Sequence, residues 1–291
     1  MRILLIGGSG FLGLALAKEL IKKKHLITIY DLEKPDIKSK LINFTKGNAL
    51  NTNLLKKVIK KNQIVYHLAG ISDIGEAIQK PTQTVEQNIL ATVNILSICS
   101  KFKIKRFVFA STIYVHSSQG GFYRISKNCC EQFIEEFEEK RKLKYTILRY
   151  GTIYGPSKNL KNNINRITSQ ALKKNIVKYD GSVLTKRKVI YISDAAQASC
   201  EILKKKYENK VVMISGKKYE KIKQIMSIIK KKLNIKSPLI FKNKKIEGHY
   251  ILHPFTYKKP KEIKLMPKKP IKTEDGIDQI IYFLKNNYEK I

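Results

Sequence analysis

The glycine pattern near the start of the chain constrains the fold more than any other feature. A short apolar run, residues 2–6, is typical of a buried strand, and Gly7, Gly10 and Gly13 follow it directly. In a strand–turn–helix unit, the first glycine permits a tight turn, the second lets the backbone approach a pyrophosphate, and the third lets helix and strand pack closely. The free N–H groups at the start of the following helix attract phosphates. The pattern therefore predicts a dinucleotide site, and the alternative is a plain strand–helix turn.

An acidic residue follows at a suitable distance. A second apolar strand, residues 26–30, ends at Asp31, about twenty residues beyond the glycine turn, where a ribose diol is held in dinucleotide sites. A carboxylate accepts hydrogen bonds from a free 2′-hydroxyl and repels a 2′-phosphate. We therefore predict NAD rather than NADP as the cofactor, and we interpret the nearby Lys34 as a solvated loop residue.

Tyr123 and Lys127 form a Y-x-x-x-K step in front of a helical pattern that covers residues 125–138. Residues four apart share one helix face, so the phenol and the ammonium can face one pocket. A cation about 5 Å away, at an effective dielectric constant of about 20, favours the phenolate by roughly 3 kcal/mol. The pair therefore predicts a tyrosine of lowered pKa that acts as an acid/base. In a lysine-rich chain the alternative is a chance spacing.

Strand and helix patterns alternate along the first half of the chain, which argues for a parallel sheet with helices on both faces. Ligands in such sheets bind at the carboxyl ends of the strands, where Gly7, Asp31, Ala69, Ser111 and Arg149 all fall. The fold class predicted is α/β, a doubly wound parallel sheet. Residues 1–156 are assigned to the cofactor-binding domain, with 186–200 returning to it, and 157–291 to a smaller α/β lobe that covers the crevice and binds substrate.

The charge, the cysteine and histidine spacing and the apolar runs of the sequence limit which ligands and partners are expected. A net charge of +35 could indicate a polyanion partner, but the lysines are spread along the whole chain and arginine is scarce. We therefore do not expect nucleic-acid binding, and a milder interpretation is that the positive field attracts an anionic substrate. The four cysteines and five histidines show no metal-ligand spacing, so no metal site is expected. No apolar run approaches the ~18 residues of a membrane span, and we expect a cytoplasmic location.

The motifs together resemble the extended short-chain dehydrogenase/reductases of the NAD-dependent epimerase/dehydratase family, from Met1 to about Ala198. Besides the glycine turn and the Y-x-x-x-K step, the resemblance rests on five segments: His-Leu-Ala-Gly at 67–70, Gln-Asn-Ile-Leu-Ala-Thr-Val-Asn at 87–94, Phe-Val-Phe-Ala-Ser-Thr at 107–112, Leu-Arg-Tyr-Gly-Thr-Ile-Tyr-Gly-Pro at 148–156, and Arg-Lys-Val-Ile-Tyr-Ile-Ser-Asp-Ala-Ala at 187–196. It implies a Rossmann-type fold and enzymes that act mostly on nucleotide-activated sugars. Long helices are expected at residues 83–101 and 125–140, and the resemblance implies that they pair across a homodimer as a four-helix bundle. Packing on the sheet is the alternative role of these two helices.

The resemblance implies roles for the matched residues. Tyr123 exchanges a proton with a sugar hydroxyl, Lys127 holds the nicotinamide ribose, and Thr112 hydrogen-bonds the reacting oxygen. Substrate contacts are expected from Thr112, Thr152 and Arg187, the last to phosphate. Cofactor contacts are expected from Gly7, Gly10, Phe11, Leu12, Asp31, Asn48, Ala49, Leu68, Ala69, Gly70, Asn88, Ala110, Ser111, Tyr123, Lys127, Tyr150, Gly151 and Ile153.

Departures from the family pattern indicate the reaction. Sugar 4,6-dehydratases of the family carry Asp-Glu after the threonine, whereas Ile113 and Tyr114 stand there in this chain. Elimination is therefore disfavoured, and so is decarboxylation, because the nearby glutamate of the decarboxylases is missing. We predict an NAD-dependent nucleotide-sugar epimerase. The alternatives are an NAD(P)-dependent sugar dehydrogenase or ketoreductase, and a non-catalytic, nucleic-acid-associated protein. The connection from Thr112 to Tyr123 is short, and Gly120-Gly121 would permit the tight return.

Overall fold

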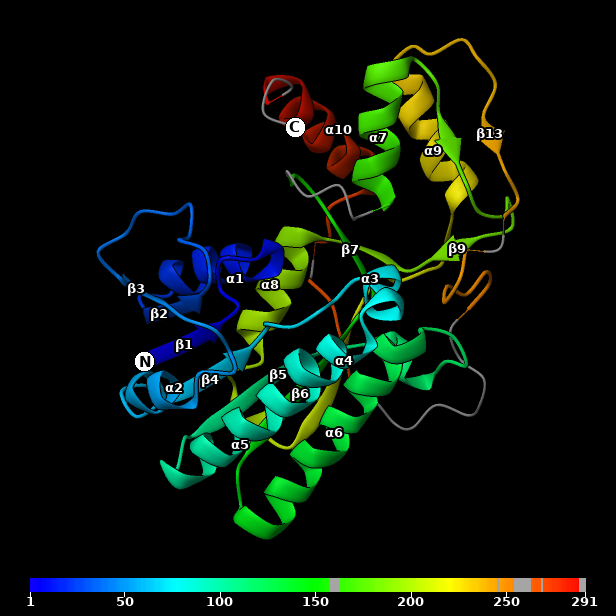
Figure 1. Ribbon diagram of the computed structural model, residues 1–291. Coiled ribbons are helices and arrows are strands. Elements are labelled where there is room, and N and C mark those ends of the chain that lie inside the picture. Colours follow the sequence, from blue (N-terminus) through cyan, green and yellow to red (C-terminus); the bar gives the residue numbers. More distant parts are fainter. Residues whose placement is uncertain (158–162, 245, 254–262, 268, 288–291) are drawn as a thin grey trace.

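The computed structural model describes residues 1–157, 163–244, 246–253, 263–267 and 269–287. Within these residues, one sheet has eight parallel strands in the order β14-β11-β6-β5-β4-β1-β2-β3 (Figure 1). Their bounds are β1 (Arg2–Ile6), β2 (Leu26–Asp31), β3 (Ile42–Lys46), β4 (Ile64–His67), β5 (Arg106–Thr112), β6 (Tyr145–Tyr150), β11 (Lys210–Ile214) and β14 (Ile263–Leu265). The predicted doubly wound parallel sheet is confirmed.

Helices cover both faces of this sheet. The central strands β1, β4, β5 and β6 are almost wholly buried, as their continuous apolar sequences require when both faces are covered. One face packs on α2 (Thr52–Ile59), α5 (Ala91–Lys101) and α6 (Gly121–Arg141). The other packs on α1 (Phe11–Lys22) and α8 (Ile192–Glu201). In α1 the buried residues Gly13, Leu16, Ala17 and Leu20 recur at helical spacing, so one face of the helix meets the sheet.

The helix predicted from residue 83 to residue 101 is built from three consecutive segments. These are α4 (Pro81–Thr84), the π-helical turn η1 (Val85–Leu90) and α5. Asn88 in η1 is buried and its side chain bonds both backbone groups of Ile71, with Nδ2 to the carbonyl oxygen at 3.0 Å and Oδ1 from the amide at 2.8 Å. The widened turn thus fastens the helix to the loop after β4.

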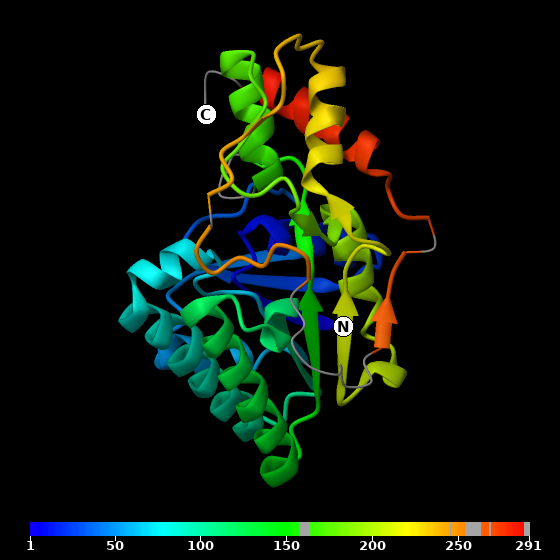
Figure 2. The same cartoon turned by 90° about the vertical axis from the view of Figure 1, so that its right-hand side faces the viewer.

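A second group of helices lies above the carboxyl ends of the strands, visible at the top of Figures 1 and 2. It contains α7 (Asn163–Lys174), α9 (Ile222–Lys232) and α10 (Thr273–Asn286), which share an apolar cluster of their own. Short strands form separate two-stranded pairs: β7 (Thr152–Tyr154) with β10 (Val189–Tyr191), β9 (Lys186–Arg187) with β12 (Glu220–Lys221), and β8 (Lys178–Tyr179) with β13 (Ile240–Phe241). Strands β11 and β14 come from the range assigned to this lobe yet complete the main sheet, so that range contributes to both parts.

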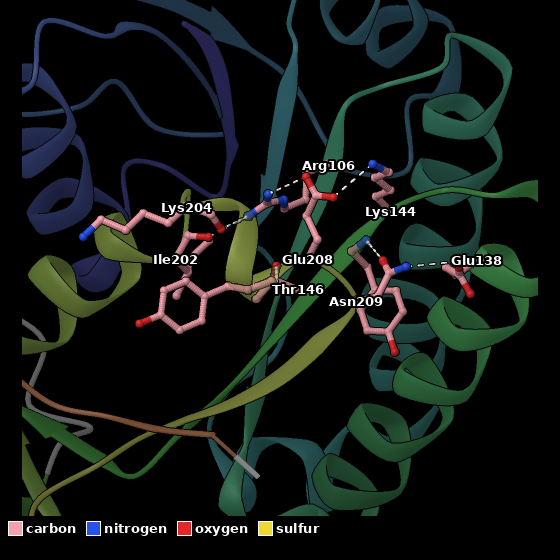
Figure 3. A network of polar contacts seen from close by, with 10 residues as sticks. Arg106, Glu138, Lys144, Thr146, Ile202, Lys204, Glu208 and Asn209 are labelled. Atoms are coloured by element: carbon pink, nitrogen blue, oxygen red, sulfur yellow. Dashed lines mark hydrogen bonds and ion pairs between the residues drawn. The ribbon is translucent and has the colours of Figure 1, made fainter.

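A polar network joins the far end of the sheet to the chain that returns from the lobe (Figure 3). The Nη2 atom of Arg106, on β5, donates to Glu208 at 2.9 Å, and Lys144 donates to the other oxygen of that carboxylate at 3.0 Å. Asn209 donates to Glu138 of α6 at 3.0 Å. These contacts fix the entry of β11 beside β6, at the opposite end of the strands from the glycine turn.

Candidate active site

The carboxyl ends of β1, β2, β4, β5 and β6 surround a cavity of about 800 Å³, within the range of small-molecule sites. Most of the predicted contacts line it: Gly7, Gly10, Phe11, Leu12, Asp31, Asn48, Ala49, Leu68, Ala69, Gly70, Ala110, Ser111, Thr112, Tyr123, Lys127, Tyr150, Gly151 and Ile153. Segments that are far apart in the sequence therefore meet at one edge of the sheet, as the strand-end argument predicts.

The glycine turn forms one end of the cavity. Gly7 has a φ of +83°, and a Cβ there would stand 2.5 Å from the amide nitrogen of Ala69. A Cβ on Gly13 would meet the carbonyl oxygen of Gly7 at 2.6 Å, so helix and strand touch at this point. Within 4 Å, a Cβ on Gly10 would meet only that same oxygen, at 3.4 Å, and Gly10 itself lines the cavity.

These features fit a bound dinucleotide. No side chain caps the start of α1, so its first N–H groups and positive dipole end can serve a phosphate. Asp31 lines the same cavity, and its Oδ2 accepts from the amide of Ser9 at 2.9 Å. The carboxylate is thereby held beside the turn, in the position that a ribose diol requires.

The other end of the cavity carries the predicted catalytic side chains. Thr112 ends β5, and Tyr123 and Lys127 lie one turn apart on α6. The helix begins at Gly121, four residues before the predicted pattern. Gly120 and Gly121 have φ angles of +108° and +50°, so two left-handed residues make the short return possible, as expected. Tyr123 therefore lies in the first turn of α6, near its positive dipole end.

Hydrogen bonds and burial set the chemistry of this group. Burial raises the pKa of Tyr123 to about 12, and the side chain of Thr112 lowers it by a smaller amount. Lys127 donates to the carbonyl oxygen of Ala110 at 2.9 Å, and its Nζ lies 4.6 Å from the centre of the Phe109 ring. Burial lowers the pKa of Lys127. The prediction that the ammonium brings the pKa of Tyr123 below its usual value is wrong in this structure, because burial outweighs every favourable contact.

Three predicted residues lie off the cavity wall. Asn88 bonds Ile71, and its Nδ2 also donates to Ser126 at 2.9 Å. Thr152 lies in β7, one residue past the cavity-lining Gly151. Arg187 is 4% exposed, and its Nη1 donates to the carbonyl oxygens of Lys186 and Tyr250 at 2.8 and 2.7 Å.

Aromatic side chains close the space beside Thr112. The ring centres of Tyr114 and Tyr250 are 5.1 Å apart, and the Tyr114 hydroxyl lies 3.1 Å from Nδ1 of His249. Burial, followed by the charge of Arg187, lowers the pKa of His249 to about 4, so this imidazole is neutral near pH 7. The guanidinium of Arg187 thus faces an aromatic cluster rather than the cavity.

The sequence reasoning missed several residues of the wall: Ser9, Tyr30, Asp73, Gln87 and Ser157. The Tyr30 hydroxyl donates to the carbonyl oxygen of Asn48 at 2.8 Å. Ser9 lies within the glycine turn and Tyr30 directly precedes Asp31. Both residues could therefore have been predicted from these motifs. Asp73 and Ser157 come from connections, for which the sequence carried no equivalent signal. Gln87 lies in η1 and opens the segment 87–94 that resembles the family, so that segment was its signal.

The fold and this site define a class: an α/β enzyme built around a dinucleotide at the ends of a parallel sheet. Residues 3–215 match the model of the NAD dependent epimerase/dehydratase family. The chain belongs to this family and is an NAD-dependent enzyme of it, as predicted from the motifs.

Individual relatives extend over the whole chain. A putative UDP-glucose 4-epimerase of Methanocaldococcus jannaschii is 25% identical, covering 98% of this chain and 99% of the relative. The structure of UDP-glucuronic acid 4-epimerase from Bacillus cereus, in complex with UDP-glucuronic acid and NAD, is similar with a TM-score of 0.85 at 23% identity, covering 99% and 100% of the two chains. That of UDP-glucose 4-epimerase from Thermotoga maritima, with UDP-glucose, gives 0.84 at 21% identity and the same coverage. At this identity the solved structures confirm the fold alone.

No helix in the described ranges combines the length and the apolar character that crossing a membrane needs.

Proposed function

We propose that this enzyme is a nucleotide-sugar epimerase in which Tyr123, Thr112 and Lys127 carry the chemistry. One observation carries the proposal: Thr112, Tyr123 and Lys127 line the same cavity as the glycine turn and Asp31. The glycine turn and Asp31 would hold NAD at one end of this cavity, and Thr112, Tyr123 and Lys127 line its other end. NAD, when bound, supplies a hydride acceptor.

Each side chain has a distinct task in the proposed reaction. The Tyr123 oxygen takes the proton from a sugar hydroxyl and later returns it. The Thr112 hydroxyl holds the reacting oxygen and orients it toward Tyr123. Lys127, fixed by the Ala110 carbonyl oxygen, adds a positive charge that favours the phenolate once the proton has been taken.

The choice of epimerisation over elimination rests on the residues beside Thr112. Ile113 is buried, and the Tyr114 hydroxyl is engaged with His249. Neither can serve as a carboxylic acid toward a leaving hydroxyl. A sugar dehydrogenase or ketoreductase would use the same three residues, and it differs by leaving reduced cofactor in solution.

The named relatives act on UDP-linked hexoses, which makes these the first substrates to test. We would incubate the purified protein with UDP-glucose, UDP-galactose, UDP-glucuronic acid and UDP-N-acetylglucosamine, with and without NAD, and follow the products by NMR. A new sugar stereoisomer without net NADH supports the proposal. Stoichiometric NADH would identify a dehydrogenase, and an unchanged sugar panel would contradict the proposal.

We also propose a homodimer formed through η1 and α6. Both carry exposed apolar side chains, namely Val85, Leu90, Phe122, Ile125 and Phe133, which are 38–52% exposed. Such a patch is costly in water and is typical of an interface. Light scattering should give twice the chain mass for the wild type and the monomer mass for Ile125→Asp/Phe133→Asp. Tyr282→Asp, on α10, is the control, because Tyr282 is 73% exposed on the other lobe.

A further inference from the structure

A buried ion pair lies behind the cavity wall, between α6 and the ends of β5 and β6. Glu131 and Arg149 are 4% and 7% exposed. Glu131 Oε2 accepts from Arg149 Nη2 at 2.5 Å, and Oε1 accepts from Arg149 Nε at 3.0 Å. The Ser111 hydroxyl also donates to Glu131, and Arg149 Nη1 donates to Nε2 of His116. None of these contacts is explained by the folding of a single element, because the four residues come from three strands or helices and the turn η2 (Ile113–His116).

The two outer members of this cluster flank Thr112 in the chain. Ser111 precedes Thr112 directly on β5, and His116 ends the η2 turn that follows it. One is held by Glu131 and the other by Arg149. The backbone that carries Thr112 is therefore anchored on both sides by a single ion pair.

Glu131 also belongs to the helix that carries the other two side chains. Tyr123, Lys127 and Glu131 are spaced by four residues and share one face of α6, since residues four apart lie one above the other. Ser111 and Arg149 are paired in register across β5 and β6. The ion pair thus connects the helix bearing Tyr123 and Lys127 to the strand bearing Thr112.

Burial of two charges is expensive, and a buried ion pair usually adds little stability over apolar residues of the same shape. The free-energy cost of burying Glu131 and Arg149 is understandable if their directional hydrogen bonds fix side-chain positions that apolar packing would not define. We infer that Glu131 and Arg149 are positioning residues that hold Thr112 against Tyr123 and Lys127. The inference rests on the proposed roles of those three residues.

Glu131 also affects the charge around Lys127. Helix α6 packs against α3 (Ile74–Gln79), η1, η2, β5 and β6. The ionisable residues of these elements include Glu76, Glu86, Tyr114, His116, Arg149 and Tyr150, and Asp73 caps the start of α3. The groups that act on the charge of Lys127 are His67 of β4 and Cys130 and Glu131 of α6, and Tyr114 acts on Tyr123. Glu131 and Cys130 raise the pKa of Lys127 against the larger effect of burial. Glu131→Gln leaves Arg149 and Lys127 as two positive charges without this carboxylate, which favours the Tyr123 phenolate.

The test compares Glu131→Gln with Glu208→Gln. Glu208 also pairs with a buried arginine, Arg106, but at the opposite end of the sheet (Figure 3). With UDP-glucose or UDP-glucuronic acid as substrate, Glu131→Gln should lower kcat by about tenfold to a hundredfold, as expected for misplaced groups, with KM within about twofold. The acidic limb of its pH profile should move to lower pH, by about one unit. Glu208→Gln should keep the wild-type kcat and profile.

A second readout does not depend on turnover. Thr112 can be observed by methyl NMR of threonine-labelled protein, with its signal assigned through Thr112→Val. In Glu131→Gln the Thr112 methyl should lose order, and in Glu208→Gln it should not. If neither sugar is turned over by the wild type, the proposed function is in question, while this measurement still decides the role of the ion pair.

If Glu131→Gln does not fold, substitutions at His116 provide a second test of the positioning role. His116→Gln retains an acceptor for Arg149 and should preserve kcat, whereas His116→Phe removes it and should lower kcat with KM unchanged. Equal kcat, equal pH profiles and an equally ordered Thr112 methyl in all variants would overturn the inference.

Discussion

Tyr123 and Thr112 line one cavity, because the connection between them turns back through two left-handed glycines, Gly120 and Gly121. Burial raises the pKa of this tyrosine to about 12. Because the phenolate is the base, its population rises with pH below that value. Turnover should therefore increase with pH through the neutral range.

Tyr123→Phe removes the oxygen that exchanges the proton and keeps the ring. We expect turnover to fall about a hundredfold or more, as is typical when general acid–base catalysis is lost, and the rise with pH to disappear. NAD binding, followed by quenching of protein fluorescence, should be retained. Near-normal turnover in this variant would show that another group moves the proton.

Alanine substitutions at Gly13 and Gly10 should affect different properties, the thermal stability in one case and the NAD affinity in the other. Gly13→Ala places a Cβ 2.6 Å from the Gly7 carbonyl oxygen, and we expect a clear loss of thermal stability. Gly10→Ala has room in the fold, but Gly10 lines the cavity. It should melt near the wild-type temperature and lose NAD affinity. Calorimetry and NAD titration together check both, and equal behaviour of the two variants would contradict the assigned roles.

Asp31 should decide between the two dinucleotides. Asp31→Asn keeps an oxygen that can accept from Ser9 but removes the charge that repels a 2′-phosphate. NAD affinity should fall about tenfold, the scale of one hydrogen bond to a charged group, while NADP binding improves. Asp36→Asn, an exposed neighbour outside the cavity, should change neither Kd. Unchanged discrimination in Asp31→Asn would remove this residue from cofactor selection.

His67 should make the protein sensitive to acid. Its Nε2 lies 3.0 Å from Oγ1 of Thr92, and Nδ1 has no hydrogen-bond partner among the residues that the structure describes. Burial lowers the pKa of His67 to about 3 from an ordinary 6.5. The folded state thus favours the neutral ring, and its contribution is complete above pH 6.5. It is lost as the pH falls from 6.5 toward 3, by about 1.4 kcal/mol for each pH unit. Urea unfolding between pH 7 and 4 should show a shallower loss for His67→Gln than for the exposed control His253→Gln. Parallel curves would contradict this.

Local patterns predicted the doubly wound parallel sheet and the strand-end residues Gly7, Asp31, Ala69 and Ser111 of the cavity wall, and the family resemblance supplied most of the other wall residues. Continuous apolar runs fix buried strands, and a glycine that meets another backbone at 2.5 Å cannot be replaced freely, so such positions are readable in a single chain. Strand β3 was not predicted, because its sequence Ile-Asn-Phe-Thr-Lys is only half-buried and lacks a continuous apolar run. The start of α6 was placed late because Gly120 and Gly121 act through positive φ angles rather than through apolar periodicity.

The orientation of Arg187 could not be read from local pattern. Its direction depends on Tyr250, 63 residues later, and the space beside Thr112 is filled by a contact between Tyr114 and His249, which are 135 residues apart. Such contacts follow from how the second lobe packs on the sheet. The raised pKa of Tyr123 was not predicted for the same reason. It results from burial, and burial depends on many neighbours that are distant in the sequence.

The placement of β11 beside β6 has a practical consequence. A chain truncated at residue 156 would lose β11 and β14 and leave the backbone groups of β6 unpaired along an open edge, which invites aggregation. It would also lose α8, and the apolar side chains that α1 packs against α8 would be exposed. Experiments on cofactor binding therefore require the full-length chain, and a protease cut between the lobes should release no soluble amino-terminal fragment.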